Sequence, residues 1–282
     1  MWLWLSVASA LLLGVYDVAK KQALKYNSVY WILLCATALT TLFLSPFLSA
    51  RPITDHYPLM FKAVLVSISW ISGLKAMECL PLTTVSTIKA SRPMFVVIFS
   101  IILFGERLNL QQWLGVAVVM AALFLSSRSS HHDTDKMTSA KGILFMAFSV
   151  FSGAASALWD KMILQRLEPL FVQSWTNLYI TVILAIVLLL QYLVRRDHFK
   201  PLSWDWRILL IAVFITVSDA LYFFAVKQPD ALLSIISMIR RTSVVITFLG
   251  GVLVLKEGHV RDKALVLVMM LVGVALLLSG SA

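Results

Sequence analysis

Four basic residues stand inside apolar stretches of the chain, where charged side chains are rare. Lys89 and Arg92 lie in one such stretch, and Arg240 and Arg241 lie in another. A charge at the centre of a membrane helix costs about 2.5–3.5 kcal/mol on insertion scales, so such residues tend to face a bundle interior or a wet cavity. Converging cations attract anions, since Arg binds phosphate or carboxylate through a planar fork and Lys acts as a point charge. The four residues therefore predict an anion-binding pocket.

Helical spacing favours a shared site for these cations. Lys89 and Arg92 are three residues apart and therefore share a helix face. Arg240 and Arg241 come about ten residues, or roughly 15 Å, into their segment, which places them near the bilayer centre. In an alternative interpretation, internal acids neutralise the cations. The candidate acids are Asp17, Asp160 and Asp219. Complete neutralisation would need all three acids and more, which favours a functional cationic pocket.

Acidic and aromatic residues in other apolar stretches add to this predicted site. Asp219 has Tyr222 one turn later on the same helix face, and it can pair with Arg240 or Arg241. A salt bridge for which a substrate competes would act as a gate. Trp70 is a weaker substrate-binding candidate, because single tryptophans in membrane proteins are more often interfacial anchors.

Two aromatic–acid pairs form a second group of candidates. Tyr16-Asp17 and Trp159-Asp160 each fall late in an apolar stretch. A carboxyl group at low dielectric can carry a proton, so these four residues are candidates for coupling or gating. The alternative, which we favour, is that both acids balance neighbouring lysines at the membrane interface. Those lysines are Lys20, Lys21 and Lys161.

The elements that must position these residues are membrane-spanning helices. Of the 282 residues, 60% are hydrophobic and 13% are charged, against roughly a quarter charged in a soluble domain. A span needs roughly 20 mostly apolar residues, and a helix satisfies its own backbone hydrogen bonds in lipid. Ala8-Ser9-Ala10 resembles a signal-peptide cleavage site, but no basic residue precedes it, so we keep this stretch as the first span. The ten predicted spans are about 2–21, 28–49, 60–78, 82–104, 109–127, 141–161, 170–194, 205–226, 231–255 and 263–280.

The ten segments divide into two similar halves around a polar linker. We expect a first five-helix repeat over 1–127, a linker over 128–140 and a second five-helix repeat over 141–282. Because each half has an odd number of spans, the second half must be inverted relative to the first. Rare charged residues carry the match between the halves. Lys89 corresponds to Arg240 and Glu106 to Glu257 at an offset of 151, and Asp17 corresponds to Asp160 at an offset of 143.

Short motifs at the span ends are similar to those of a known family. They are Ala90-Ser91-Arg92-Pro93-Met94-Phe95, Phe104-Gly105-Glu106-Arg107-Leu108, Trp113-Leu114-Gly115 and, in the second half, Lys256-Glu257-Gly258. With the span count and the duplication, they make nearly the whole chain resemble the EamA-like family of the drug/metabolite transporter superfamily. The resemblance implies a ten-helix basket with alternating access through a central cavity. The second copy departs from the pattern, since Val244 stands where Pro93 has its counterpart.

The basic residues near the ninth span add a second resemblance within the same superfamily. A Lys/Arg pair at this place is similar to the phosphate-binding pattern of plastid phosphate translocators, and here the pair is Arg240 and Arg241. This resemblance implies a phosphorylated substrate.

Loop charges and the family resemblance favour opposite membrane orientations. Loops after odd-numbered spans carry most of the Lys and Arg, which favours placing both termini outside the cytoplasm. The family resemblance favours termini in the cytoplasm. The few basic residues that we place in loops after even-numbered spans are Arg51, Lys62, Arg107 and Arg166.

These observations predict a secondary transporter of small anionic metabolites, phosphorylated or carboxylated, in the plasma (inner) membrane of a bacterium. The alternatives are an exporter of amino acids or other zwitterions, and a flippase or accessory protein for phosphate-bearing lipids. We expect no enzyme activity, since neither a phosphate-binding loop for ATP nor a known catalytic motif is present. We likewise expect no cofactor, metal site or nucleic-acid partner. The expected partners are a small-molecule substrate and the lipid bilayer.

Overall fold

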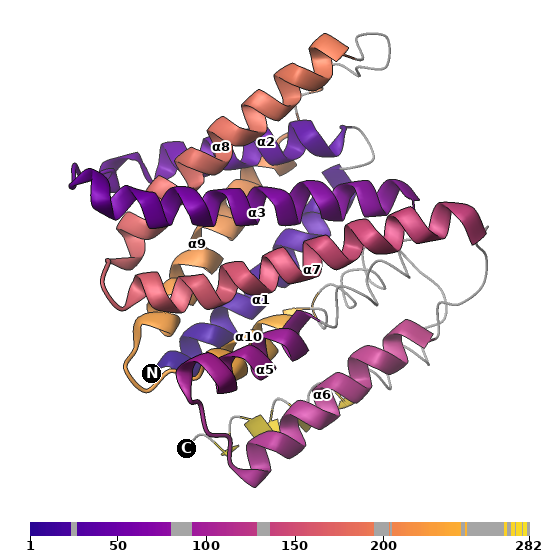
Figure 1. The fold of residues 1–282 in the computed structure, drawn as a ribbon, viewed down its shortest axis with the longest axis vertical. Coiled ribbons are helices and arrows are strands. Elements are labelled where there is room, and N and C mark those ends of the chain that lie inside the picture. The colour runs from indigo at the N-terminus through magenta and orange to yellow at the C-terminus, as the bar shows by residue number, and fades with distance from the viewer. Residues whose placement is uncertain are drawn as a thin grey trace.

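The computed structural model describes a bundle of helices (Figure 1). It describes residues 1–23, 27–79, 92–128, 136–194 and 205–243, and separate positions at 203, 246, 268–269, 272–273, 275–277 and 279–280. Every regular element within these ranges is a helix, which confirms the all-α class. Several residues that the sequence singles out lie outside the described residues, namely Lys89, Ala90, Ser91, Val244, Lys256, Glu257 and Gly258.

The described helices overlap nine of the ten predicted segments, and the tenth segment, 263–280, lies largely outside the described residues. The first half holds α1 (Trp2–Ala23), α2 (Val29–Phe43), the 3₁₀ helix η1 (Ser45–Phe47), α3 (Ile53–Cys79), α5 (Arg92–Phe104) and α6 (Leu110–Arg128). The second half holds α7 (Lys136–Leu164), α8 (Pro169–Val194), α9 (Arg207–Lys227) and α10 (Leu233–Arg241). Helix α7 begins inside the stretch expected as a linker.

Helix α3 differs most from the predicted segment, because it begins at Ile53 and not near residue 60. Pro52 precedes it and Asp55 lies in its first turn, a usual pattern for a helix start. Charged and polar residues in its first turns hide this start from a search for apolar runs. Lys62, which we expected in a loop, therefore lies inside the helix.

Several of these helices can cross a membrane. Among the described residues, four helical stretches are long and apolar enough, namely Trp2–Lys20, Ala140–Leu164, Pro169–Leu193 and Arg207–Lys227. The apolar stretches of α2, α5 and α6 are shorter. Large apolar side chains cover the outer face of α8, including the exposed Ile186, Leu189 and Leu193. Such a face suits a lipid solvent. The full count of ten spans remains a prediction.

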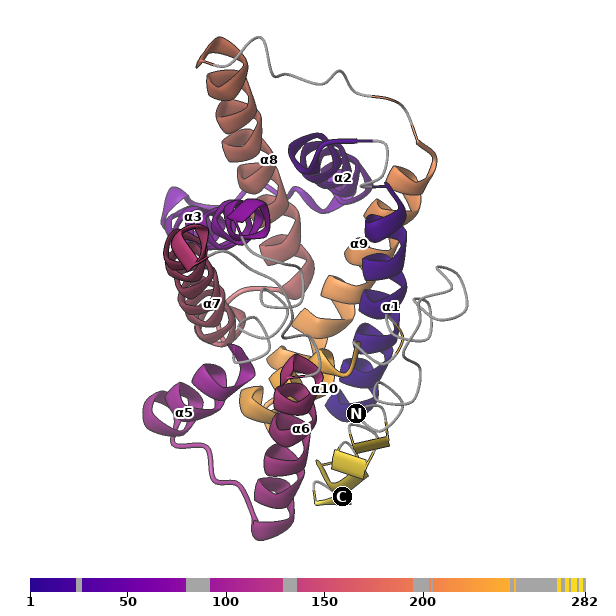
Figure 2. The ribbon, with the colours of Figure 1, turned by 90° about the vertical axis from the view of Figure 1, so that its right-hand side faces the viewer.

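Paired serines hold two antiparallel helix pairs together. Ser69 of α3 and Ser149 of α7 each donate from the hydroxyl to the other's backbone carbonyl, at 2.8 and 2.6 Å. Ser9 of α1 and Ser218 of α9 do the same at 2.7 and 2.8 Å. Small hydroxyl residues let helix backbones approach closely in a membrane. Figure 2 shows the two pairs, α3 with α7 and α1 with α9.

The helix contacts match those that two inverted halves would produce. If the two halves are related by a two-fold axis, span one corresponds to span six and span eight to span three. A contact between spans one and eight then implies a matching contact between spans six and three. The same axis also brings spans two and seven together, and spans four and nine. The structure has all four contacts. They are α1 with α9 (spans one and eight), α7 with α3 (spans six and three), α2 with α8 (spans two and seven), and α5 with α10 (spans four and nine). This agreement supports the predicted duplication, and the repeat boundaries remain a prediction.

One carboxylate ties three helix ends together. Helix α5 ends at Phe104, and Gly105 adopts a left-handed backbone (φ 63°) that a side chain would strain. Glu106 follows and is buried. Its Oε1 accepts from Lys161 Nζ at 2.6 Å and from the Leu233 N–H at 2.8 Å. Its Oε2 accepts from the N–H and the hydroxyl of Ser234 at 3.1 and 2.5 Å. Glu106 thus caps the N-terminus of α10, where free N–H groups favour an anion.

Replacing Glu106 by alanine should lower the free energy of unfolding by about 3–5 kcal/mol, since Lys161 loses its carboxylate partner and keeps only the Ala231 carbonyl, while the first N–H groups of α10 lose their acceptor. Thermal and denaturant unfolding of the purified protein in detergent measures this. The control is Glu168→Ala, because Glu168 is 70% exposed and lies 3.7 Å from Arg51. Surface pairs of this kind contribute about 0–1 kcal/mol. Equal effects of the two variants would contradict the capping role.

Candidate functional site

A cavity of about 290 Å³ lies between helices of both halves. Side chains from α1, α2, α3, α7, α8, α9 and α10 line it, together with the first residue of α5. Nine of the predicted site residues lie on its wall. They are Tyr16, Asp17, Trp70, Arg92, Asp160, Asp219, Tyr222, Arg240 and Arg241.

Two predicted site residues are not part of this wall as the structure describes it. Lys89 lies outside the described residues. Trp159 lies in the contact between α3 and α7, where its Nε1 donates to the Pro58 carbonyl at 3.0 Å. Its ring packs edge-on against Phe61, with 5.0 Å between ring centroids. This position offers Trp159 packing contacts and no place on the cavity wall.

Charged residues of both signs line the cavity, with cations in excess. The basic residues are Lys20, Lys62, Arg92, Arg240 and Arg241, and the acidic residues are Asp17, Asp160 and Asp219. With all of them ionised, the described wall carries a formal charge of +2. Charges act over longer distances here than in bulk water, because the surrounding helices lower the dielectric.

The Arg240–Asp219 ion pair is open to the cavity. Arg240 Nη2 donates to Asp219 Oδ1 at 2.6 Å, and the two side chains are 20% and 27% exposed. The Tyr222 ring lies under the guanidinium, 4.2 Å from Arg240 Cζ to the ring centroid. Of the two arginines that we considered for Asp219, the structure selects Arg240. An incoming anion can reach this pair.

The Lys62–Asp160 ion pair is closed off by its neighbours. Lys62 Nζ lies 2.6 Å from Asp160 Oδ1, and the two side chains are only 3% and 7% exposed. The ammonium also lies 3.9 Å from the centroid of the Phe223 ring. The contact is electrostatic, since neither Lys62 Nζ nor Asp160 Oδ1 has a hydrogen-bond partner of good geometry among the described residues.

This pair corrects two expectations. We expected Asp160 to balance Lys161, and we placed Lys62 in a loop. Lys161 instead pairs with Glu106. Residues next to each other on a helix point in different directions, so Asp160 and Lys161 do not face each other and each finds a partner on another element.

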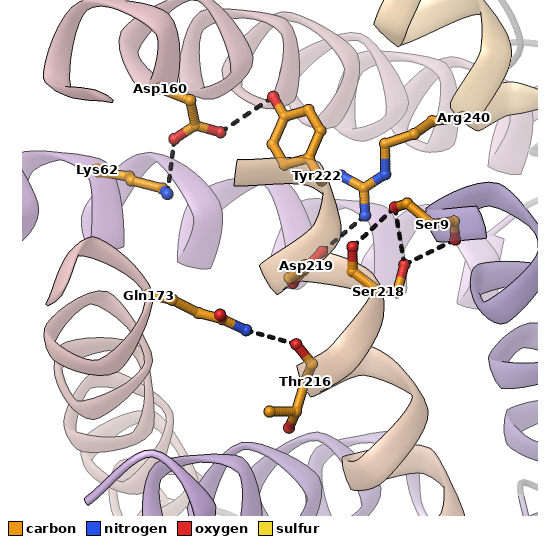
Figure 3. A network of polar contacts seen from close by, with 9 residues as sticks. All are labelled: Ser9, Lys62, Asp160, Gln173, Thr216, Ser218, Asp219, Tyr222 and Arg240. Atoms are coloured by element: carbon orange, nitrogen blue, oxygen red, sulfur yellow. Dashed lines mark hydrogen bonds and ion pairs between the residues drawn. The ribbon is translucent and has the colours of Figure 1, made fainter. Parts of the chain in front are cut away.

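Tyr222 joins the two ion pairs (Figure 3). Its hydroxyl donates to Asp160 Oδ2 at 3.3 Å, while its ring supports Arg240. The result is a chain of contacts that runs from Lys62 on α3 through Asp160 on α7 and Tyr222 on α9 to Arg240 on α10 and its partner Asp219. If Arg240 exchanges Asp219 for another partner, the change can therefore alter the contacts of Tyr222 and Asp160 at the other end.

Arg92 has a backbone partner and no carboxylate partner among the described residues. Its Nη2 donates to the carbonyl of Gly153 on α7. Arg240 and Arg241 lie near enough to repel it electrostatically, and Asp160 attracts it without forming an ion pair. Arg92 is thus a cavity cation whose charge no described ion pair cancels.

Tyr16 and Lys20 form the α1 side of the cavity. Lys20 Nζ lies 5.6 Å from the centroid of the Tyr16 ring, and Asp17 lies beside them on the wall. We expected Lys20 only as an interfacial partner of Asp17, whereas in the structure it lies on the cavity wall. The residue stands one turn after Tyr16, and that spacing was the signal in the sequence.

Neutral polar side chains complete the wall and were missed at the level of sequence. They include Ser69, Ser149, Ser156, Thr176, Asn177 and Ser237. Hydroxyl and amide groups on apolar helices are common in helix contacts, so sequence alone gives them no special role.

The fold and the site define a polytopic helical membrane protein with a charged internal cavity shared by two halves. A family model, the EamA-like transporter family, matches residues 1–128 and again residues 140–279. The chain belongs to this family, and it is an integral membrane transporter of the drug/metabolite kind. A search of curated proteins finds no match. A protein solved by crystallography has a similar fold, with a TM-score of 0.80, 13% identity, and coverage of 98% of this chain and 95% of the other.

Asp160→Ala should lower the free energy of unfolding by about 3–5 kcal/mol, because it leaves the buried Lys62 ammonium unpaired. Unfolding in detergent measures the loss. The double variant Lys62→Met/Asp160→Leu removes both charges and should be destabilised less than Asp160→Ala alone. Additive losses in the double variant would show that the two charges are not coupled.

Proposed function

We propose that the protein is a secondary transporter that carries a small anionic metabolite, phosphorylated or carboxylated, through the central cavity by alternating access. The observation that carries this proposal is the excess of cations on the cavity wall, with Arg92 in no ion pair among the described residues. An anion would lower the electrostatic energy of these groups, and guanidinium groups bind its oxygens bidentately.

The size of the cavity supports a small metabolite over a lipid. About 290 Å³ is at the lower end of the roughly 300–1,000 Å³ that ligand pockets occupy. A phosphate or carboxylate ester of a few carbons fits such a volume. A phosphate-bearing lipid would have to leave its acyl chains outside this volume.

The open Arg240–Asp219 pair supports a gating role in alternating access. A substrate anion competes with Asp219 for Arg240, and Tyr222 links that pair to Asp160 on α7. Asp160 in turn pairs with Lys62 on α3 of the first half, so binding can change contacts between the two halves. Such a differential interaction is what a ligand needs to shift a conformational equilibrium.

Asp17, Asp160 and Tyr16 remain candidates for coupling or gating, and the closed Lys62–Asp160 pair favours charge balance for Asp160.

The transport energy would come from gradients, as expected without an ATP-binding motif. We place the protein in the plasma membrane of a bacterium.

The same open pair supports a second candidate, transport of an amino acid or another zwitterion. Arg240 offers a cation and Asp219 an anion side by side on the wall, both partly exposed. A zwitterion would place its carboxylate on Arg240 and its ammonium group on Asp219.

Arg240→Ala should reduce anion transport by at least about tenfold, the usual effect of losing one charge-assisted hydrogen bond. Uptake of phosphate, a three-carbon phosphate ester and succinate into proteoliposomes measures it. Arg166→Ala is the matched control, because Arg166 is exposed at the end of α7. Equal uptake by wild type and Arg240→Ala would contradict the assignment.

Asp219→Asn separates the two candidate functions. For an anion carrier, the amide removes the competitor of the substrate, so anion affinity should stay unchanged or rise. For a zwitterion carrier, the loss of the carboxylate should weaken amino-acid binding by about tenfold. Ligand-induced shifts of the unfolding temperature, with succinate and threonine as ligands, report both affinities.

A further inference from the structure

The guanidinium of Arg92 lies directly against Gly153, a glycine inside helix α7. A Cβ atom added at Gly153 would lie 2.6 Å from Arg92 Cζ, 2.8 Å from Nη1 and 2.9 Å from Nε. Carbon contacts are normally about 3.5–4.0 Å. A side chain at position 153 would therefore force the guanidinium, the far end of the Arg92 side chain, to move away from this place.

The backbone of Gly153 also holds the guanidinium in place. Arg92 Nη2 donates to the Gly153 carbonyl, and Gly153 itself is buried. The contact joins α5 of the first half to α7 of the second. A glycine inside a helix costs about 0.5–1 kcal/mol relative to alanine, so this position bears a cost that the seat for Arg92 explains.

Two of the other cavity cations need no such seat, because acidic groups position them. Asp219 holds Arg240 and Asp160 holds Lys62. Arg92 pairs with no described acid, and its guanidinium would move freely without the hydrogen bond to the Gly153 carbonyl. A free side chain pays conformational entropy when it binds a ligand, whereas a fixed one does not.

We infer that Gly153 is a positioning residue for anion recognition, which seats the Arg92 guanidinium so that it meets the substrate anion in a fixed orientation. This inference rests on the proposed function. The ligand chemistry is that of an oxyanion, phosphate or carboxylate, whose two oxygens face the edge of the fork. In this arrangement Gly153 sets affinity without touching the substrate.

The test compares Gly153→Ala, Arg92→Ala and the double variant, using thermal-shift titrations with inorganic phosphate, a three-carbon phosphate ester and succinate. Gly153→Ala should weaken binding of the anion that the wild type binds by about tenfold, as should Arg92→Ala. The double variant should show no further loss, because the alanine acts only through the guanidinium.

Unfolding temperatures provide a readout that needs no ligand. Gly153→Ala should lower the unfolding temperature when Arg92 is present. In the Arg92→Ala background it should raise that temperature, since alanine is the better helix former. The matched control is Gly115→Ala on α6, where an added Cβ would lie 2.8 Å from Leu277 Cγ, away from the cavity wall. It should lower stability and leave anion affinity within about twofold.

Arg92→Lys tests the same idea with Gly153 intact, in case Gly153→Ala does not fold. The ammonium keeps the charge and lacks the fork, so affinity should fall by about the same factor as in Arg92→Ala. Wild-type affinity in Gly153→Ala or in Arg92→Lys would overturn the inference and leave the proposed function standing. A wild type that binds none of the three anions would overturn both.

Discussion

Charge compensation at low dielectric is the constraint on which this structure depends. The described helices bring five basic and three acidic side chains to one cavity wall. Two of the cations are matched by carboxylates at 2.6 Å, one pair closed off and one open to the cavity. Burying an ion pair is costly unless its geometry is good, and leaving one charge alone is costlier still. The open pair and the unmatched Arg92 are therefore the places where a substrate charge can lower the energy.

Polar contacts between the helices hold these charged side chains in place around the cavity. Reciprocal serine bonds hold α1 to α9 and α3 to α7, and Glu106 fixes the start of α10. Because α10 is short, its capped N-terminus also sets where Arg240 and Arg241 reach the cavity. Lys161 joins the same carboxylate from the end of α7, one residue after Asp160. The carboxylate that stabilises the fold thus also positions the site.

The sequence allowed the helical class and much of the site to be predicted. Rare charges in apolar segments pointed to Arg92, Arg240 and Asp219, and helical spacing placed Tyr222 beside Asp219. Lys62 was missed because the polar first turns of α3 mask the helix start in an apolar-run search. The partner of Asp160 was wrong because adjacency along the chain is not adjacency in space. The role of Gly153 depends on which helix packs against α7, and a single sequence does not contain that information.

The most direct test is to locate a bound anion in the protein by crystallography with arsenate, a phosphate analogue whose arsenic scatters anomalously. Anomalous density within hydrogen-bonding distance of Arg92 on the cavity wall, with Asp219 displaced from Arg240, is the predicted result. Saturating arsenate with no density in the cavity, or density confined to surface lysines, would contradict the assignment of an anion site.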